Sequence, residues 1–212
     1  MAAKTVLPPR MAVLTGDAVG SRQWPAGDLD RLFVDFEETC VKAALWCKHP
    51  VRLVRHRGDG WQCAIQDASL ATRLALLLRA TALARGHDTR VAIAAGPLVD
   101  GWTPESDPGL WVAGPFEDSG RALDKMPSAR RLVHYDARGA HAACVALLDA
   151  VSGGWNDQQA RAAREALSPD SIPQGAIAKR LGVSQPTISQ WLRAAHWSAV
   201  RDALRALEST RL

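Results

Sequence analysis

Apolar positions along the first 150 residues follow two alternating periods, which predict a mixture of strands and helices. Short apolar runs and strict alternation favour strands, whereas apolar residues three or four positions apart favour helices. The predicted strands cover residues 11–16, 51–55, 61–65, 90–95, 110–113 and 131–135. The predicted helices cover residues 28–46, 70–84, 117–125 and 138–150. This order of elements, β-α-β-β-α-β with additions, predicts an α+β fold in which helices pack against a face of one sheet.

Segments rich in glycine, proline and other turn-forming residues separate the predicted elements. The sequence Arg57-Gly58-Asp59-Gly60 separates two alternating runs and predicts a β-hairpin turn. Residues 100–109 are rich in Pro, Gly and Asp and predict a loop. The small residues at 151–154 lie between two predicted helices, which favours a flexible connector there. We therefore expect one domain over residues 1–150 and a second, all-helical domain over residues 151–212.

The second domain carries a helix-turn-helix pattern. Helices are predicted over residues 155–167, 174–181 and 196–207, with a further helix beginning after Ser184. Pro173 suits a first helical position, Gly182 permits the positive φ that the turn needs, and Ser184 can cap the helix that follows. Residues 174–192 resemble the helix-turn-helix consensus, in which one small and several apolar residues form a core, here Ala178, Leu181, Val183, Ile188 and Leu192.

Polar side chains occupy the outward face of the second helix of this pattern. Hydroxyls, amides and an arginine are groups that read base edges and phosphates in the major groove of DNA. We predict that double-stranded DNA is bound by Ser184, Gln185, Thr187, Ser189, Gln190 and Arg193, together with Lys179 and Arg180 of the preceding helix. The alternative is a helical hairpin without a DNA partner, but the registered apolar positions favour the DNA-binding interpretation. The two-fold symmetry of many operators favours a homodimer.

Charge and composition agree with a DNA-binding protein. The 212 residues carry a net charge of +4, and residues 155–212 hold eight basic against five acidic residues, as attraction to phosphates would favour. No apolar run approaches the roughly 20 residues that cross a bilayer, and the first ten residues lack the apolar segment of a secretory signal. The four cysteines lack metal-ligand spacing. We expect a cytoplasmic protein that does not associate with membranes.

Two aspartates in the first domain indicate a site for phosphate groups. Asp17 follows the first predicted strand and precedes a run of small residues, and Asp59 lies in the hairpin turn. A carboxylate at a strand end can hold Mg²⁺ while loop amides face phosphates, and a second carboxylate could share the ion. Asp17 and Asp59 are thus the candidate metal ligands. The alternative is that Asp17 only caps a turn and Asp59 belongs to an ordinary hairpin.

These strings resemble motifs of the SatD family and of the related class III nucleotidyl cyclase fold. The pattern GD-x-x-x-SR matches residues 16–22, the loop 17–20 resembles the first cyclase metal motif, and residues 58–60 resemble the second. Residues 91–96 and 114–123 resemble the strand and the helix start that follow. The resemblance spans residues 11–150 and implies a ferredoxin-like domain that dimerises and senses a ligand, with a nucleotide and Mg²⁺ as candidates. The ligand and phosphate contacts that it implies are Asp17, Gly20, Ser21, Arg22, Arg55, Asp59 and Arg121.

Departures from the cyclase pattern bear on catalysis. Cyclases carry an Asn and an Arg four residues apart to stabilise charge on the transferred phosphate, and counting from Gly114 places Asp118 and Ala122 there. An acidic side chain beside a phosphate increases the repulsion that such a site must relieve. Arg121 lies one residue out of register, and Arg55 stands where cyclases carry a base-selecting residue. We infer that nucleotide binding could survive while cyclisation does not.

Three functions remain open from the sequence. The leading hypothesis is a transcription regulator whose degenerate cyclase-like domain dimerises and senses a ligand. The alternative is an active nucleotidyl cyclase with a DNA-binding tail, and the third is a relic domain that serves only as a dimerisation scaffold. Four tryptophans could line a ligand pocket, although packing is the commoner role for such residues: Trp24, Trp61, Trp102 and Trp111.

Overall fold

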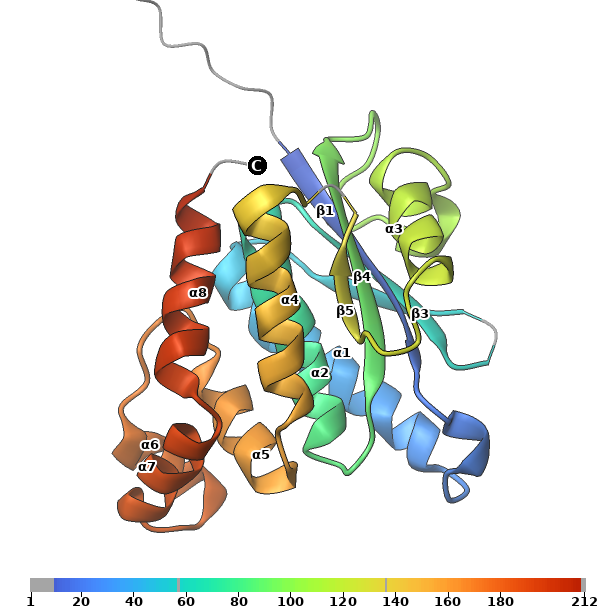
Figure 1. The fold of residues 1–212 in the computed structure, drawn as a ribbon. Coiled ribbons are helices and arrows are strands. Elements are labelled where there is room, and N and C mark those ends of the chain that lie inside the picture. The colour runs from blue at the N-terminus through green and yellow to red at the C-terminus, as the bar shows by residue number, and fades with distance from the viewer. Residues whose placement is uncertain (1–9, 57, 136, 211–212) are drawn as a thin grey trace, which may run out of the picture.

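A five-stranded mixed sheet organises the first part of the chain in the computed structural model, which describes residues 10–56, 58–135 and 137–210 (Figure 1). The strand order across the sheet is β2-β3-β1-β4-β5. The first four strands pair antiparallel, and β5 pairs parallel to β4. The strands are β1 (Arg10–Ala18), β2 (Arg52–Arg55), β3 (Gly60–Ile65), β4 (Thr89–Pro97) and β5 (Leu132–His134).

Helices cover both faces of this sheet and make up the whole C-terminal region. Four helices lie between the strands in the sequence or directly after the last one: α1 (Asp28–Cys47), α2 (Ala71–Leu83), α3 (Pro115–Asp124) and α4 (Gly139–Gly153). Four more complete the chain: α5 (Asp157–Ala166), α6 (Gln174–Leu181), α7 (Gln185–Ala194) and α8 (Trp197–Ser209). Together the sheet and helices form an α+β fold with an all-helical C-terminal region.

The alternation of side chains along the strands divides the sheet residues between two cores. Ala12 and Leu14 of β1 pack with α1, α2 and α4 on one face. Met11 and Val13 point to the other face, where they pack with Phe116 of α3 and Trp102. Figure 1 shows α3 on the opposite side of the sheet from α1, α2 and α4. Because every strand near the centre is covered on both sides, the β1 and β4 sequences read as nearly continuous apolar runs.

Gly16 allows a large aromatic side chain to lie across β1. A Cβ atom at this position would stand 2.3 Å from the ring of Trp61 and 2.4 Å from the backbone carbonyl oxygen of Arg90, so no other residue fits unless both the ring and β4 move. Trp61 is fully buried, packs edge-on against Phe36 and donates from Nε1 to Thr89 Oγ1 at 3.2 Å. The glycine before Asp17 is therefore explained by core packing.

One predicted strand, at residues 110–113, is wrong. The chain instead forms a single 3₁₀ turn over Pro108–Leu110, whose start is capped by the Asp107 side chain accepting from the backbone N–H of Gly109 at 2.8 Å. Leu110 and Val112 are 79% and 82% exposed, while Trp111 between them stacks on Phe116. The alternation of these residues thus reflects one anchored aromatic ring rather than strand pairing.

The C-terminal helices pack directly onto the helices of the sheet. Residues 151–153, expected to form a flexible connector, are the last turn of α4. Helices α5 and α8 contact α2, and α8 also contacts α4, so that Trp155 and Leu204 share one buried core with α2. The division into domains at residue 150 stays a prediction. None of the helices within the described ranges has the combination of length and apolarity that crossing a bilayer requires.

Candidate nucleic-acid interface and phosphate site

The turn between α6 and α7 has the geometry that its sequence predicts. Gly182 ends α6 with φ 67° and ψ 31°, a left-handed conformation that favours glycine. Ser184 caps α7, because its Oγ accepts from the backbone N–H of Thr187 at 3.3 Å. Pro186 lies in the first turn of α7, where a missing N–H leaves no helical hydrogen bond unmade.

A small buried core holds α6 and α7 together and attaches them to α5. Ile188 and Leu192 of α7 pack on Ile177 and Ala178 of α6. The core continues to Ala162 and Ala166 on α5, while Leu181 and Val183 cover its edge and stay partly exposed. The apolar register of the two helices therefore fixes which side chains of α7 face outward.

The outward face of α7 is polar, as the sequence predicts. Gln185, Ser189, Gln190 and Arg193 are exposed. Ser184 is also exposed, but its hydroxyl lies 2.8 Å from that of Thr187, so these two side chains serve the cap of the helix. Gln185, Ser189, Gln190 and Arg193 therefore form an exposed polar row with the chemistry to contact base edges.

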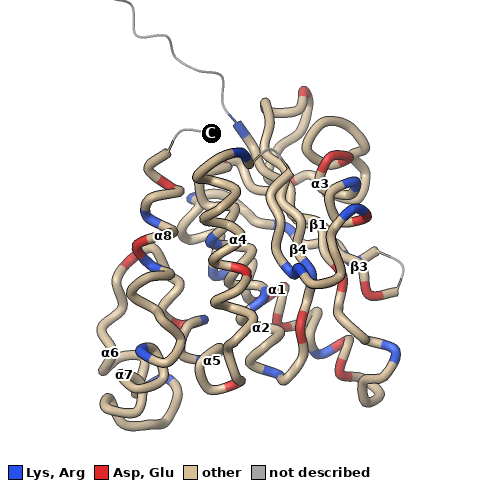
Figure 2. The backbone as a smooth tube through the Cα atoms, in the orientation of Figure 1, with Lys and Arg blue, Asp and Glu red and all other residues tan. Residues whose placement is uncertain are grey.

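The two predicted basic residues of α6 differ in their surroundings. Lys179 and Arg180 are both exposed, but Arg180 turns back toward α5 and donates to Glu165 Oε2 at 3.2 Å. Further basic residues lie on α8, where Arg201 contacts Asp202 at 3.0 Å. Figure 2 shows that basic positions occur around the sheet as well as on these helices, so charge alone does not single out this surface.

The structure brings Asp17, Gly20, Ser21 and Asp59 together at the end of β1. Asp17 pairs in register with Gly60 of β3, which places the 58–60 turn beside it. The backbone N–H of Ala18 donates to the Asp59 carbonyl at 3.2 Å, and the Ser21 hydroxyl donates to Asp59 Oδ2. Gly20 has φ 69° and leads into the short 3₁₀ turn of residues 21–23, on which Arg22 is exposed.

Arg90 is the ion-pair partner of Asp17, a neighbour that the sequence analysis does not identify. It lies opposite Asp17 on β4, and its Nε donates to Asp17 Oδ1 at 2.8 Å while Nη2 donates to Oδ2. The hydrogen bond to Asp17 raises the pKa of Arg90 above its ordinary value. This two-pronged pair occupies both oxygens of the carboxylate. Only the register between β1 and β4 could have indicated it.

The other predicted phosphate contacts are held by different partners. Arg55 lies 4.4 Å from the Phe33 ring centroid and donates to Asp30 at 2.6 Å and to the Gly58 carbonyl at 3.0 Å. Arg121 pairs with Glu117 and lies 3.8 Å from Asp118, both on its own helix. Among the described residues, neither arginine is paired with Asp17 or Asp59.

Both predicted metal ligands, Asp17 and Asp59, are engaged by protein side chains in this structure. Asp17 already faces the guanidinium of Arg90, and Asp59 accepts from Ser21. Within residues 10–56, 58–135 and 137–210, no group of three or more His, Cys, Asp or Glu side chains is arranged to hold a metal. Magnesium is commonly held by one or two carboxylates together with waters and phosphates, so an ion at Asp17 would have to displace the guanidinium of Arg90.

The four tryptophans considered as pocket residues make packing contacts. Trp61 and Trp102 are 0% and 4% exposed, each in one of the cores of the sheet. Trp111 stacks on Phe116, and Trp24 stacks on His87 with ring centroids 3.8 Å apart. These contacts account for the rings without a ligand.

Comparisons with known proteins add no relative to this description. No protein-family model matches the chain, and no curated protein resembles it significantly.

Proposed function

We propose that this chain is a DNA-binding transcription regulator in which α6 and α7 form a helix-turn-helix unit and α7 enters the major groove. The observation that carries the proposal is the exposed row of Gln185, Ser189, Gln190 and Arg193, held outward by the buried core of α6 and α7. The left-handed Gly182 and the Ser184 cap support the same geometry.

We further propose that the sheet and its helices form a ferredoxin-like domain related to the SatD family and to class III nucleotidyl cyclases. The order β1-α1-β2-β3-α2-β4 and the strand order β2-β3-β1-β4 support this assignment. A homodimer would present two α7 helices to the two halves of an operator. Sedimentation or light scattering on the purified chain tests the dimer.

Ligand sensing fits the Asp17 site better than catalysis does. Arg90 neutralises Asp17, Arg121 is engaged by acidic neighbours on α3, and Asp118 stands where a cyclase needs an amide. A phosphate group could still meet the backbone near Gly20 and the exposed Arg22. The alternative function is an active nucleotidyl cyclase with a DNA-binding tail.

Selection of genomic fragments on the purified protein tests DNA binding directly. At moderate salt we expect enrichment of a sequence, and binding to it should weaken steeply as salt rises. Arg193→Ala and Gln185→Ala should each lower affinity by about tenfold, whereas Lys125→Ala, an exposed basic position on the far side of the sheet, should not. Failure to enrich any sequence would overturn the proposal that this chain is a sequence-specific regulator.

Incubation with ATP or GTP and either Mg²⁺ or Mn²⁺ separates the regulator from the cyclase. The proposal expects no cyclic product. A cyclic product that disappears in Asp17→Ala would replace it with the alternative function, because Asp17 would then serve catalysis.

A further inference from the structure

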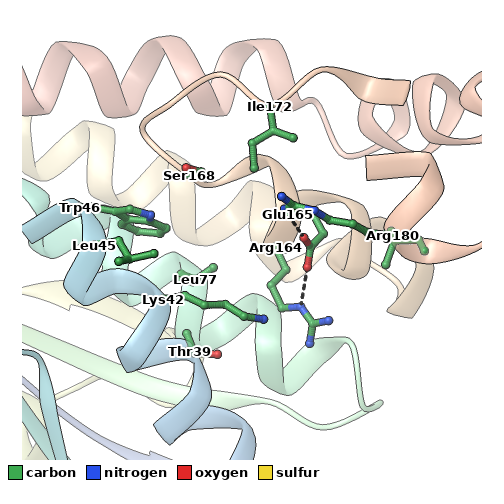
Figure 3. A pocket seen from close by; sticks show the side chains of 11 residues that line it. Thr39, Lys42, Leu45, Trp46, Leu77, Arg164, Glu165, Ser168, Ile172 and Arg180 are labelled. Atoms are coloured by element: carbon green, nitrogen blue, oxygen red, sulfur yellow. Dashed lines mark hydrogen bonds and ion pairs between the residues drawn. The ribbon is translucent and has the colours of Figure 1, made fainter. Parts of the chain in front are cut away.

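A groove lies between the helices of the sheet domain and the C-terminal helices, away from the Asp17 site. It has a volume of about 530 Å³ and is walled by α1 and α2 on one side and by α5, α6 and the segment between them on the other. Figure 3 shows Leu45 and Trp46 on one wall, with Arg164, Glu165 and Arg180 facing them. This α1–α6 groove falls in the size range of sites for small molecules.

The charged side chains of the groove are mostly positive. Lys42, Arg164 and Arg180 line it together with one carboxylate, that of Glu165. Glu165 is shared by two guanidinium groups, since Arg180 lies 3.2 Å from Oε2 and Arg164 lies 3.8 Å from Oε1. Within the described ranges, Lys42 forms no ion pair. In Figure 3 the Lys42 amine and the Arg164 guanidinium extend toward the same part of the groove. The groove therefore favours an anion.

Arg164 contains a buried donor that the described residues do not satisfy. Its Nε is inaccessible to solvent and has no hydrogen-bond partner. Its nearest acidic oxygen, Glu165 Oε1, is 3.8 Å away, which is too far for a hydrogen bond. Buried donors of this kind are nearly always paired in folded proteins. The Arg164 side chain as a whole is 27% exposed, so a ligand in the groove can reach the guanidinium group but not the buried Nε itself.

Apart from the hydroxyl residues Thr39 and Ser168, the remaining lining is apolar. Leu77 is buried at the base, Trp46 and Ile172 are partly buried, and Leu45 is 81% exposed. An exposed leucine beside a tryptophan offers a surface for a flat apolar group. The groove thus offers a basic part for the charged group of a ligand and an apolar part for the rest of it.

We propose that the α1–α6 groove binds a small organic anion, with its carboxylate or phosphate group on Lys42 and Arg164 and its apolar body against Leu45 and Trp46. Guanidinium groups pair with either kind of oxyanion through two parallel hydrogen bonds. The proposal concerns the groove alone and does not depend on DNA binding.

Calorimetric titration of the full-length protein tests the site. The probes are 2-naphthoate, 1-naphthyl phosphate and the neutral 2-naphthalenemethanol, and comparison of the first two distinguishes carboxylate from phosphate. We expect at least one anionic probe to bind with a stoichiometry of one per chain and about tenfold more tightly than the neutral one. Equal affinity for the neutral probe, or no binding of either anion, would overturn the proposal.

Variants locate the binding. Lys42→Gln changes an exposed residue and should lower the affinity for the anionic probe by about fivefold. Arg164→Gln should lower that affinity by about tenfold. Glu165→Gln removes the acidic neighbour and should strengthen binding. Lys125→Gln, outside the groove, is the matched control and should leave binding unchanged. Binding that survives Lys42→Gln undiminished places the anion elsewhere and contradicts the assignment, even where Arg164→Gln fails to fold.

Discussion

Two histidines at the end of the sheet show how burial sets the chemistry of a single residue. His134 of β5 is 8% exposed and its ring centroid lies 4.9 Å from that of His141. Neither ring has a hydrogen-bond partner among the described residues. Desolvation, followed by repulsion from His141 and Arg10, lowers the pKa of His134 to about 4. The folded protein therefore keeps this ring neutral at pH values where an exposed histidine takes up a proton.

His134 makes the stability of the fold depend on pH. The folded pKa of about 4 lies below the ordinary 6.5, so below pH 6.5 the unfolded chain takes up a proton at this histidine that the folded chain does not. The resulting loss of stability is absent above pH 6.5 and grows as the pH falls toward 4. The loss from this residue amounts to about 3 kcal/mol. Urea unfolding at pH 7 and at pH 4 should show a smaller loss in His134→Leu than in the wild type. His56→Leu, at an exposed position, is the control, and an equal loss in both variants would contradict the assignment.

At the scale of elements, the turn between α6 and α7 rests on one backbone conformation. Gly182→Ala should lower the free energy of unfolding by about 1 kcal/mol, because the methyl group opposes the left-handed φ of 67°. Gly120→Ala provides a control of opposite sign: Gly120 lies within α3 with open space around it, so alanine should stabilise by about 0.5 to 1 kcal/mol. Denaturant titration measures both free energies of unfolding. An unchanged value for Gly182→Ala would show that the turn does not require a left-handed conformation at this residue.

Local features of the sequence predict most of the secondary structure, because their causes lie within a few residues. The helix α6 begins and ends where Pro173 and Gly182 indicate, and Ser184 caps α7. The strand expected at 110–113 fails for the opposite reason, since Trp111 is placed by a ring on α3. Periodicity cannot report such a distant partner.

The candidate sites depend on distant contacts to different degrees. Motif order indicates that Asp17 and Asp59 come together, and the strand register confirms their proximity. The pairing of Asp17 with Arg90 requires knowledge of that register, which no local pattern supplies. The α1–α6 groove is less predictable still, because Lys42 and Arg164 meet only after the C-terminal helices pack on α1 and α2.

At the scale of the whole molecule, the C-terminal helices are tied firmly to the sheet domain. Arg73 of α2 is 3% exposed and donates to the Leu167 carbonyl at 3.0 Å and to both carboxylate oxygens of Glu208 on α8. Trp155 Nε1 donates to the Ala195 carbonyl at 3.0 Å. With these contacts buried, a change at the groove reaches α6 and α7 through packed helices rather than through a loose tether.

An anion in the groove should therefore weaken DNA binding. It would add negative charge beside Arg180 and α6, next to the surface that we propose meets DNA phosphates, and this repulsion acts most strongly at low salt. We expect a saturating anionic probe to raise the Kd for the selected operator by about fivefold, within the usual range of allosteric coupling. Fluorescence anisotropy of labelled operator measures the shift, and in Lys42→Gln the same shift should require about fivefold more probe.

Thermodynamic linkage supplies an independent check on this coupling. If the probe weakens operator binding by a given factor, the operator must weaken probe binding by the same factor. Calorimetry of the probe with and without operator measures the second factor. A probe that binds but leaves the operator Kd unchanged would keep the groove as a ligand site and reject its coupling to DNA. A probe that fails to bind while operator binding persists would reject the groove and leave the regulator intact.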